Sequence, residues 1–356
     1  MVQTTSKKWL AIATLLAGST MAKPVSSSTG KSSCTPIVRK EWRTLSTQEK
    51  ADYISAVKCI MTKPALTPAF PNTGVISRYD DLVYTHIQQT NSVHFVGHFL
   101  AWHRYFTATY EKMLRSECGY QGAQPYWDWT LDTPASNYVN SPVFDPVTGF
   151  GGNGPFEASD PNGFFEVPGR TGGGCVSDGP WAGLSDVVHL GPGPNIEYNP
   201  QCLRRDLSPY FAARYLGMNQ TALTLSQPDF GWFNAVVDGK PDFEASGVHG
   251  GGHYGVGGTL GTMGDLFISP ADPIFHLHHA NLDRLWWSWQ KLDLSARLVD
   301  ISGPALLMDY SQGNSTLDTP LSVGPSAVDV TVRDVMNIEG CGAVGVCYTY
   351  DNVYTL

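Results

Sequence analysis

The sequence of 356 residues predicts one mainly α-helical domain with long loops and a few short β-strands. Apolar side chains recur three and four residues apart in several segments, as they do on the buried face of a helix. Thirty-seven glycines and 24 prolines indicate long connections between those segments. Hydrophobic residues make up 42% of the chain, enough for a sizeable core, and we find neither a repeat nor a linker between domains.

The expected helices follow one another with loops between them. They cover residues 41–59, 78–89, 98–117, 203–216 and 272–292. Ser46 or Thr47, followed by Glu49, is a capping signal for the first helix. Asp272 before Pro273 marks the start of the last one. Glycine, proline, Asn and Asp dominate 130–200, which we expect to form irregular loops, whereas Val, Thr and Tyr in 328–356 favour β-structure.

The first residues have the pattern of a cleaved secretory leader. Lys7 and Lys8 precede an apolar run over 9–18, and small residues follow it. A membrane anchor is the alternative, but the run is shorter than the roughly 20 residues that span a bilayer. We therefore expect a signal peptide at 1–22, a disordered lead-in at 23–38, a folded domain at 39–356 and a secreted, extracellular protein.

The cysteines and two glycosylation motifs fit an exported chain. All seven cysteines follow the leader, and in an oxidising compartment most should pair, although the sequence leaves the pairing open. None has the CxxC spacing of a zinc site. Asn219-Gln-Thr and Asn314-Ser-Thr are acceptor motifs for N-linked glycans.

Charge and hydropathy limit the classes of partner. The net charge of −9 comes without a basic cluster, which argues against nucleic acid. No segment after the leader resembles a membrane span, so we expect no membrane partner. The oligomeric state stays open.

Histidines carry the strongest functional signal. Of the ten in the chain, nine fall in two windows, namely His86, His94, His98 and His103, then His249, His253, His276, His278 and His279. A lone histidine on an apolar face is more often a core residue, and we would prefer that for His98 or His189 alone. Two clusters on predicted helices indicate metal binding instead.

The sequence His249-Gly-Gly-Gly-His253 places two imidazoles on one side of a helix. Each glycine costs such a helix roughly 1 kcal/mol relative to alanine, so packing or a metal must hold it. We expect the missing side chains to let another backbone approach closely. A glycine-rich loop with incidental histidines is the alternative.

The ligand types favour a pair of copper ions. Imidazole binds zinc, copper, iron and nickel. A zinc protease of the HExxH type needs a glutamate where this chain has Gly250. A non-haem iron site would need a carboxylate, and none stands out, whereas two all-histidine triplets suit Cu(I) and Cu(II).

Several motifs resemble those of one family. Residues 272–290 (DPIFHLHHANLDRLWWSWQ) resemble the second copper signature of tyrosinases, catechol oxidases and molluscan haemocyanins, and His94–Phe106 resembles the first. Pro125–Trp129 (PYWDW) and Tyr348-Thr-Tyr350 match further family motifs, so the resemblance covers residues 39–350. It implies a four-helix bundle around a dicopper centre, in a tyrosinase copper-binding domain at 39–356.

The resemblance also assigns residues. The ligands of two copper ions per chain would be His86, His94 and His103 for the first and His249, His253 and His279 for the second. His276 and His278 would have supporting roles. Asp283 would orient a ligand by pairing with Arg284 or nearby backbone, or else be a surface ion pair. Phe275 would pack against a ligand ring.

Departures from the family pattern refine the expected chemistry. No cysteine lies between Cys59 and Cys118, so the thioether that many members form with a ligand ring cannot form. Gly250 replaces an Asn that helps efficient monophenol hydroxylases to orient a water. Glu244 is the candidate catalytic residue that could still hold that water, although a solvated acidic residue is equally consistent.

The expected function is therefore O2-dependent oxidation of small phenols. We expect o-diphenols to become o-quinones, with weak monophenol hydroxylation at most. The short tail after Tyr350 predicts activity without removal of a C-terminal covering domain. The alternatives are a tyrosinase acting on a phenolic intermediate of pigment or specialised metabolism, a haemocyanin-like O2 carrier, and a structural glycoprotein.

Overall fold

A computed structural model of the chain describes residues 35–67, 73–160, 163, 166–239, 245–340 and 345–355. The expected signal peptide, most of the expected lead-in and Glu244 lie outside the described residues. The remaining residues form one compact unit.

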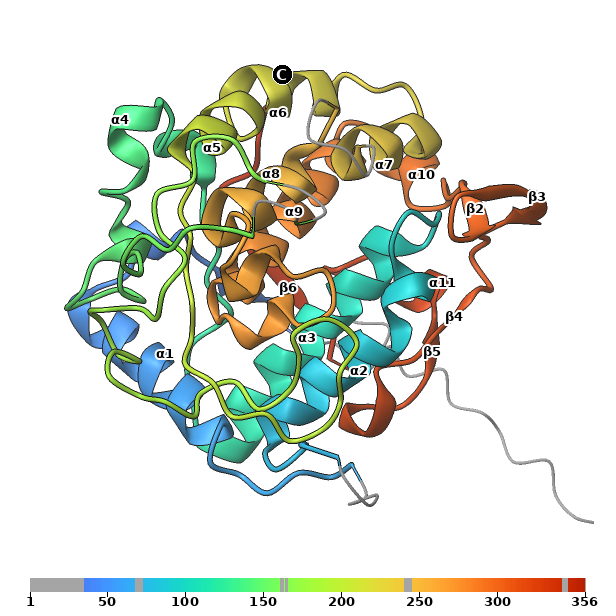
Figure 1. Ribbon diagram of the computed structural model, residues 1–356. Coiled ribbons are helices and arrows are strands. Elements are labelled where there is room, and N and C mark those ends of the chain that lie inside the picture. The colour runs from blue at the N-terminus through green and yellow to red at the C-terminus, as the bar shows by residue number, and fades with distance from the viewer. Residues whose placement is uncertain are drawn as a thin grey trace, which may run out of the picture. The chain divides into compact units, whose positions relative to one another are not determined.

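Helices dominate this unit, as the sequence predicts (Figure 1). The α-helices are α1 (Thr47–Ile60), α2 (Arg78–Val93), α3 (Phe99–Cys118), α4 (Ala135–Tyr138), α5 (Pro209–Tyr215), α6 (Met218–Leu225), α7 (Phe230–Asp238), α8 (Val248–Gly257), α9 (Ile274–Lys291), α10 (Leu294–Arg297) and α11 (Val332–Val335). Short 3-10 helices lie at Trp42–Thr44, Trp129–Leu131, Pro142–Phe144, Thr262–Gly264, Ser269–Ala271 and Gly324–Ser326. The strands are β1 (Ile37–Arg39), β2 (Pro304–Leu306), β3 (Asp309–Asn314), β4 (Pro320–Leu321), β5 (Val330–Thr331) and β6 (Tyr348–Tyr350).

Four helices form the centre of the unit. Helix α3 packs against α2 and α9, and α9 packs against α8, as Figure 1 shows for the cyan and orange ribbons. Every residue of α9 from Ile274 to Gln290 is buried, which is typical of a helix enclosed on all sides. The predicted four-helix arrangement is confirmed.

Local signals set several helix ends. Ser46, not Thr47, caps α1, and its hydroxyl and the Glu49 carboxylate form a reciprocal capping box. Helix α9 begins at Ile274, one residue later than predicted, with Pro273 and not Asp272 as its N-cap residue, although the Asp272 side chain accepts a hydrogen bond from the Ile274 N–H. Disulfides join Cys59 to Cys118 and Cys175 to Cys202, and the first of these links the ends of α1 and α3. Cys347 is also disulfide-bonded.

Three further expectations about the fold need correction. The helix expected at 203–216 begins only at Pro209, because Arg205 is drawn into an ion pair with Asp272 and Ser208 caps the helix. Helices α6 and α7 were not predicted. Ile37 and Val38, assigned to a disordered lead-in, belong to β1, which pairs in parallel with β6.

The described strands are short and form three two-stranded sheets. Strands β2 and β3 form an antiparallel hairpin, and β4 pairs with β5. The expected β-structure of the tail is partly correct, because β5 and β6 are separated by the helical turn α11. None of the helices in the described ranges combines the length and apolar character needed to cross a membrane.

Candidate metal centre

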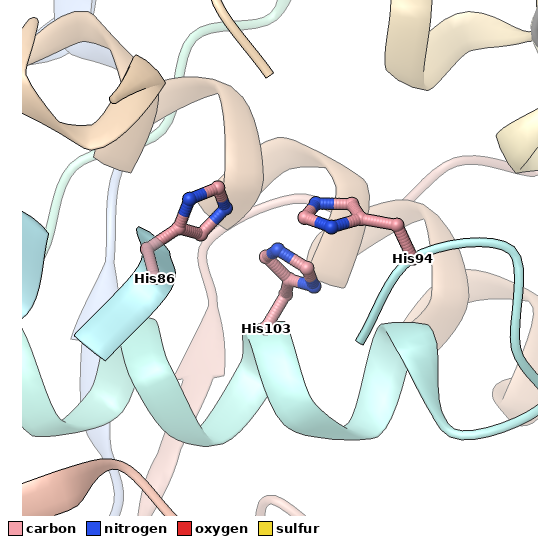
Figure 2. Close-up of side chains that lie close together, drawn as sticks. All are labelled: His86, His94 and His103. Atoms are coloured by element: carbon pink, nitrogen blue, oxygen red, sulfur yellow. The ribbon is translucent and has the colours of Figure 1, made fainter. Parts of the chain in front are cut away.

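The first three predicted ligands come together at the junction of α2 and α3. His86 lies on α2, His94 directly follows it, and His103 lies on α3 (Figure 2). One ring nitrogen from each lies within 4.8 Å of the others, and all three side chains are buried. Phe95 has φ of 52°, an uncommon conformation for a residue other than glycine, and it turns the chain from His94 toward α3.

The second three predicted ligands come from α8 and α9. His249 and His253 lie one turn apart on α8, and His279 on α9 completes a triad whose ring nitrogens also lie within 4.8 Å of one another. Close helix packing explains one of the intervening glycines. A Cβ on Gly252 would lie 2.1 Å from Cε1 of His278, so an imidazole, and not the backbone we expected, fills the space that the glycine leaves.

The two triads face each other. The rings of His103 and His279 stack with centroids 4.5 Å apart, and those of His94 and His249 stack at 5.9 Å. Each stack joins one histidine from the first window to one from the second. The two halves of the sequence therefore converge on one buried centre.

Hydrogen bonds fix the orientation of five of these rings. The Nδ1–H groups donate to the carbonyl oxygens of Phe267 (His86, 2.7 Å), Thr90 (His94, 2.8 Å), Phe99 (His103, 2.9 Å) and Met263 (His253, 3.0 Å), and to Oδ1 of Asp238 (His249, 2.9 Å). A proton held on Nδ1 leaves the Nε2 lone pair for a metal. Within the described structure, Nε2 of His86, His103 and His249 is buried without a hydrogen-bond partner. Because buried polar atoms are normally satisfied, these fit a metal site.

The electrostatics of the site favour the neutral form of all six imidazoles. Burial lowers the pKa of all six imidazoles, to about 4 for His253 and well below the usual value for His103 and His279. Neutral imidazole is the form that binds a metal. His253 is half-buried whereas the other five are buried, so the centre is most open beside its ring.

Residues 76–292 match the family model of the common central domain of tyrosinase. The chain belongs to the tyrosinase family. Its fold and site were predicted from family motifs, and this match confirms the family. Tyrosinase-family proteins are dicopper oxidases, and the two triads are possible metal sites of that kind.

Individual relatives agree with this assignment. The chain is 37% identical to a tyrosinase-like protein of Diaporthe leptostromiformis over 89% of this chain and 78% of that one. It is 36% identical to an N-acetyl-6-hydroxytryptophan oxidase of Emericella nidulans, covering 88% of this chain and 92% of the relative. A solved variant of a polyphenol oxidase from Thermothelomyces thermophila superposes with a TM-score of 0.78 at 37% identity, covering 89% of each chain.

This tyrosinase-family site contains one residue that the sequence did not reveal. Asp238, the last residue of α7, accepts the Nδ1–H of His249 and, on its other oxygen, the N–H of Phe95 at 2.9 Å. It thereby links a ligand of the second triad to the residue that follows His94 in the first. Burial raises the pKa of Asp238 to about 7. No spacing relates Asp238 to the ligands, so only the fold identifies it.

The two extra histidines of the tyrosinase-like second window have different partners. His278 donates from Nε2 to the carbonyl of His249 at 3.0 Å, so it supports helix α8. His276 stacks on Tyr110 with ring centroids 3.6 Å apart, and in the described part of the chain neither of its nitrogens has a hydrogen-bond partner. Neither belongs to a triad, in agreement with the supporting roles expected from the family.

The expected partner of Asp283 was wrong. Asp283 pairs with Arg104 and Arg39 and accepts the Tyr348 hydroxyl at 2.6 Å, whereas Arg284 pairs with Asp128. Asp283 is buried, which rules out the surface ion pair. Phe275 packs on His279 with ring centroids 4.1 Å apart, as predicted.

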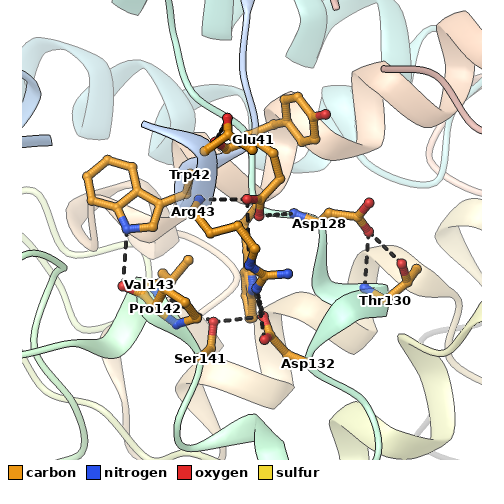
Figure 3. A network of polar contacts seen from close by, with 12 residues as sticks. Glu41, Trp42, Arg43, Asp128, Thr130, Asp132, Ser141, Pro142 and Val143 are labelled. Carbon is orange, nitrogen blue, oxygen red and sulfur yellow. Dashed lines mark hydrogen bonds and ion pairs between the residues drawn. The ribbon is translucent and has the colours of Figure 1, made fainter. Parts of the chain in front are cut away.

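The tyrosinase motif at 125–129 sits in a polar network outside the triads (Figure 3). Glu41 accepts the N–H of Asp128, and Arg43 pairs with Asp132 at 2.8 Å. Because Asp128 also pairs with Arg284 of α9, the network anchors the helix that carries His279 to the start of the domain. Burial raises the pKa of Glu41 to about 7.

Proposed function

We propose that this chain holds two copper ions and oxidises o-diphenols to o-quinones with O2. The single observation that carries the proposal is the pair of facing triads, in which neutral buried imidazoles direct Nε2 lone pairs toward one centre. Residues His86, His94 and His103 would hold one ion, and His249, His253 and His279 the other. Bound copper would supply reversible one-electron steps at two adjacent ions and open positions for O2.

The chain's own residues position these components. Backbone carbonyls and Asp238 fix the ligand rings, and burial keeps water from most of the centre. His253 is the least buried of the six histidines, so a phenol would approach from its side of the centre. Two o-diphenols and one O2 yield two o-quinones and two waters, so the phenolic protons end in water and no further oxidant is needed.

The preference for o-diphenols rests on the first turn of α8. Gly250 offers no side chain to orient a water, and a Cβ there would lie 2.2 Å from Oγ of Ser246. The Ser246 hydroxyl therefore occupies the volume that a larger residue would need. We keep Glu244 as the candidate that would hold a proton-accepting water.

A phenolic intermediate of specialised metabolism is the second candidate substrate. The relative from Emericella nidulans is named for oxidation of N-acetyl-6-hydroxytryptophan, and the alignment covers 92% of it. Oxygen uptake with 4-methylcatechol, p-cresol and a hydroxyindole would separate these possibilities. Fastest turnover of the hydroxyindole would favour the second candidate, and reversible O2 binding without turnover would favour an oxygen carrier.

A matched pair of variants tests the copper proposal. His103→Gln removes a triad member, whereas His98→Gln changes a nearby buried histidine whose Nδ1 bonds to Ser315 Oγ at 2.9 Å. We expect His103→Gln to lose copper and turnover of 4-methylcatechol, and His98→Gln to keep two coppers per chain. Equal copper content in both variants would contradict the proposed ligand set.

We further propose that the protein is exported, because its first 22 residues have the pattern of a leader. Sequencing of the mature N-terminus should place it near Lys23. A mature chain that retains Met1 would contradict export by this route.

A further inference from the structure

Helix α7 and the β2–β3 hairpin border a hollow of about 510 Å³. Trp232 of α7 and Tyr310 and Met308 of the hairpin line it. Their side chains are 63%, 75% and 45% exposed. Several large apolar side chains that share one exposed hollow mark a binding surface more often than scattered ones do.

Trp232 is unusual among the tryptophans of this protein. The eight others in the described ranges are at most 2% exposed, and they include Trp102 and Trp286 in the core. An indole ring left in water loses the packing that makes tryptophan favourable. A group of this chain that covered the ring would restore that packing.

Asn314 lies at the rim of the same hollow. It is the last residue of β3, it is exposed, and it begins the acceptor motif Asn314-Ser-Thr. Ser315 is buried, and its hydroxyl is within 2.9 Å of Nδ1 of His98. Ser315 directly follows the end of β3, and its burial beside the exposed Asn314 leaves the Asn314 side chain at the surface.

We propose that Asn314 carries an N-linked glycan whose first N-acetylglucosamine packs on Trp232 and Tyr310. The Asn314 amide nitrogen would form a bond to C1 of an oligosaccharide carried on a lipid pyrophosphate. The bond from C1 to the pyrophosphate oxygen breaks, the lipid pyrophosphate leaves, and the amide loses one proton. The apolar C–H face of the sugar would cover an aromatic ring while its hydroxyls stay in water. The inference requires export but not copper.

The second acceptor motif provides a matched control. Asn219 lies in the first turn of α6 and is also exposed, but it does not line this hollow. A glycan there would leave Trp232 uncovered. The two sites therefore differ in their expected effect on one tryptophan.

The test uses the full chain produced in yeast, where the secretory pathway supplies the sugar donor. Glycopeptide mapping should find N-acetylglucosamine on Asn314. Acrylamide quenching of tryptophan fluorescence then reports on Trp232, and a Trp232→Phe variant identifies its share of the signal. Because a stacked sugar covers one of the two faces of the indole, Asn314→Gln should raise the quenching constant of Trp232 roughly twofold.

Asn219→Gln should leave that quenching constant unchanged. If Asn314→Gln does not fold, Thr316→Ala removes the same motif and keeps Asn314. An unmodified Asn314 in the purified protein would overturn the proposal. A glycan on Asn314 whose removal leaves the quenching of Trp232 unchanged would overturn its placement in the hollow.

Discussion

The surroundings of Gly252 and Gly250 predict that alanine at the first position destabilises the protein and that alanine at the second does not. A Cβ on Gly252 would lie 2.1 Å from Cε1 and 2.3 Å from Nδ1 of the imidazole. The ring cannot yield easily, because it is fully buried and its Nε2 donates to the carbonyl of His249. A Cβ on Gly250 meets only the rotatable hydroxyl of Ser246 at less than 3 Å.

The magnitudes follow from these contacts. Overpacking costs about 1–3 kcal/mol, and a buried hydrogen bond left unmade costs about 1–3 kcal/mol more. Alanine regains about 1 kcal/mol of helix propensity over glycine. We therefore expect Gly252→Ala to lower the free energy of unfolding by about 1–5 kcal/mol. Gly250→Ala should change it little, because a new Ser246 rotamer costs about as much as the helix gains.

Urea unfolding of the copper-free variants, followed by circular dichroism, measures this difference. Gly252→Ala should also weaken copper binding at the second triad. A displaced His278 would no longer donate to the carbonyl of His249, and this hydrogen bond supports the helix that carries His249 and His253. Equal midpoints for Gly252→Ala and Gly250→Ala would refute the packing argument.

Three other substitutions or conditions test separate parts of the account. Asp238→Ala removes the acceptor of the His249 N–H and should weaken copper binding about 10–100-fold. Competition with a chelator measures this affinity, and an unchanged value would show that Asp238 does not orient the ring. Acid should unfold the copper-free protein cooperatively, because burial lowers the pKa of nine histidines below the unfolded value. The unfolded state then binds more protons below about pH 6.5, so each histidine removes about 1.4 kcal/mol of stability per pH unit as the pH falls. The pKa values of Asp238 and Glu41 are raised to about 7, so these two carboxyl groups stabilise the folded state as the pH falls, but the nine histidines outnumber them. Fluorescence that stays native at pH 4 would contradict the predicted loss of stability in acid. Gly250→Asn combined with Ser246→Gly should raise oxygen uptake with p-cresol relative to 4-methylcatechol. An unchanged ratio would show that residue 250 does not determine the preference for o-diphenols.

The sequence predicted the parts of the molecule that depend on local spacing. His249 and His253 are four residues apart, and the apolar period of 272–292 placed His279 on a buried helix. The capping signal near Ser46 is equally local. Family motifs then assigned the ligands that spacing alone left open.

Contacts between residues that are distant in the sequence determine the features that local spacing does not predict. Arg205 lies in a segment with helical propensity, but its ion pair with Asp272, 67 residues away, keeps it outside α5. Asp283 likewise pairs with Arg104 and Arg39, which are distant in the sequence, and not with its neighbour Arg284. Asp238 could not be found in advance, because its bond to the Phe95 N–H joins residues 143 positions apart, and no motif marks its bond to His249.

Anomalous diffraction at the copper edge, from crystals of the copper-loaded protein, tests the central claim most directly. Two peaks should appear, one bound by Nε2 of His86, His94 and His103 and one by the triad of α8 and α9. A single peak, or copper bound by residues outside these triads, would contradict the account.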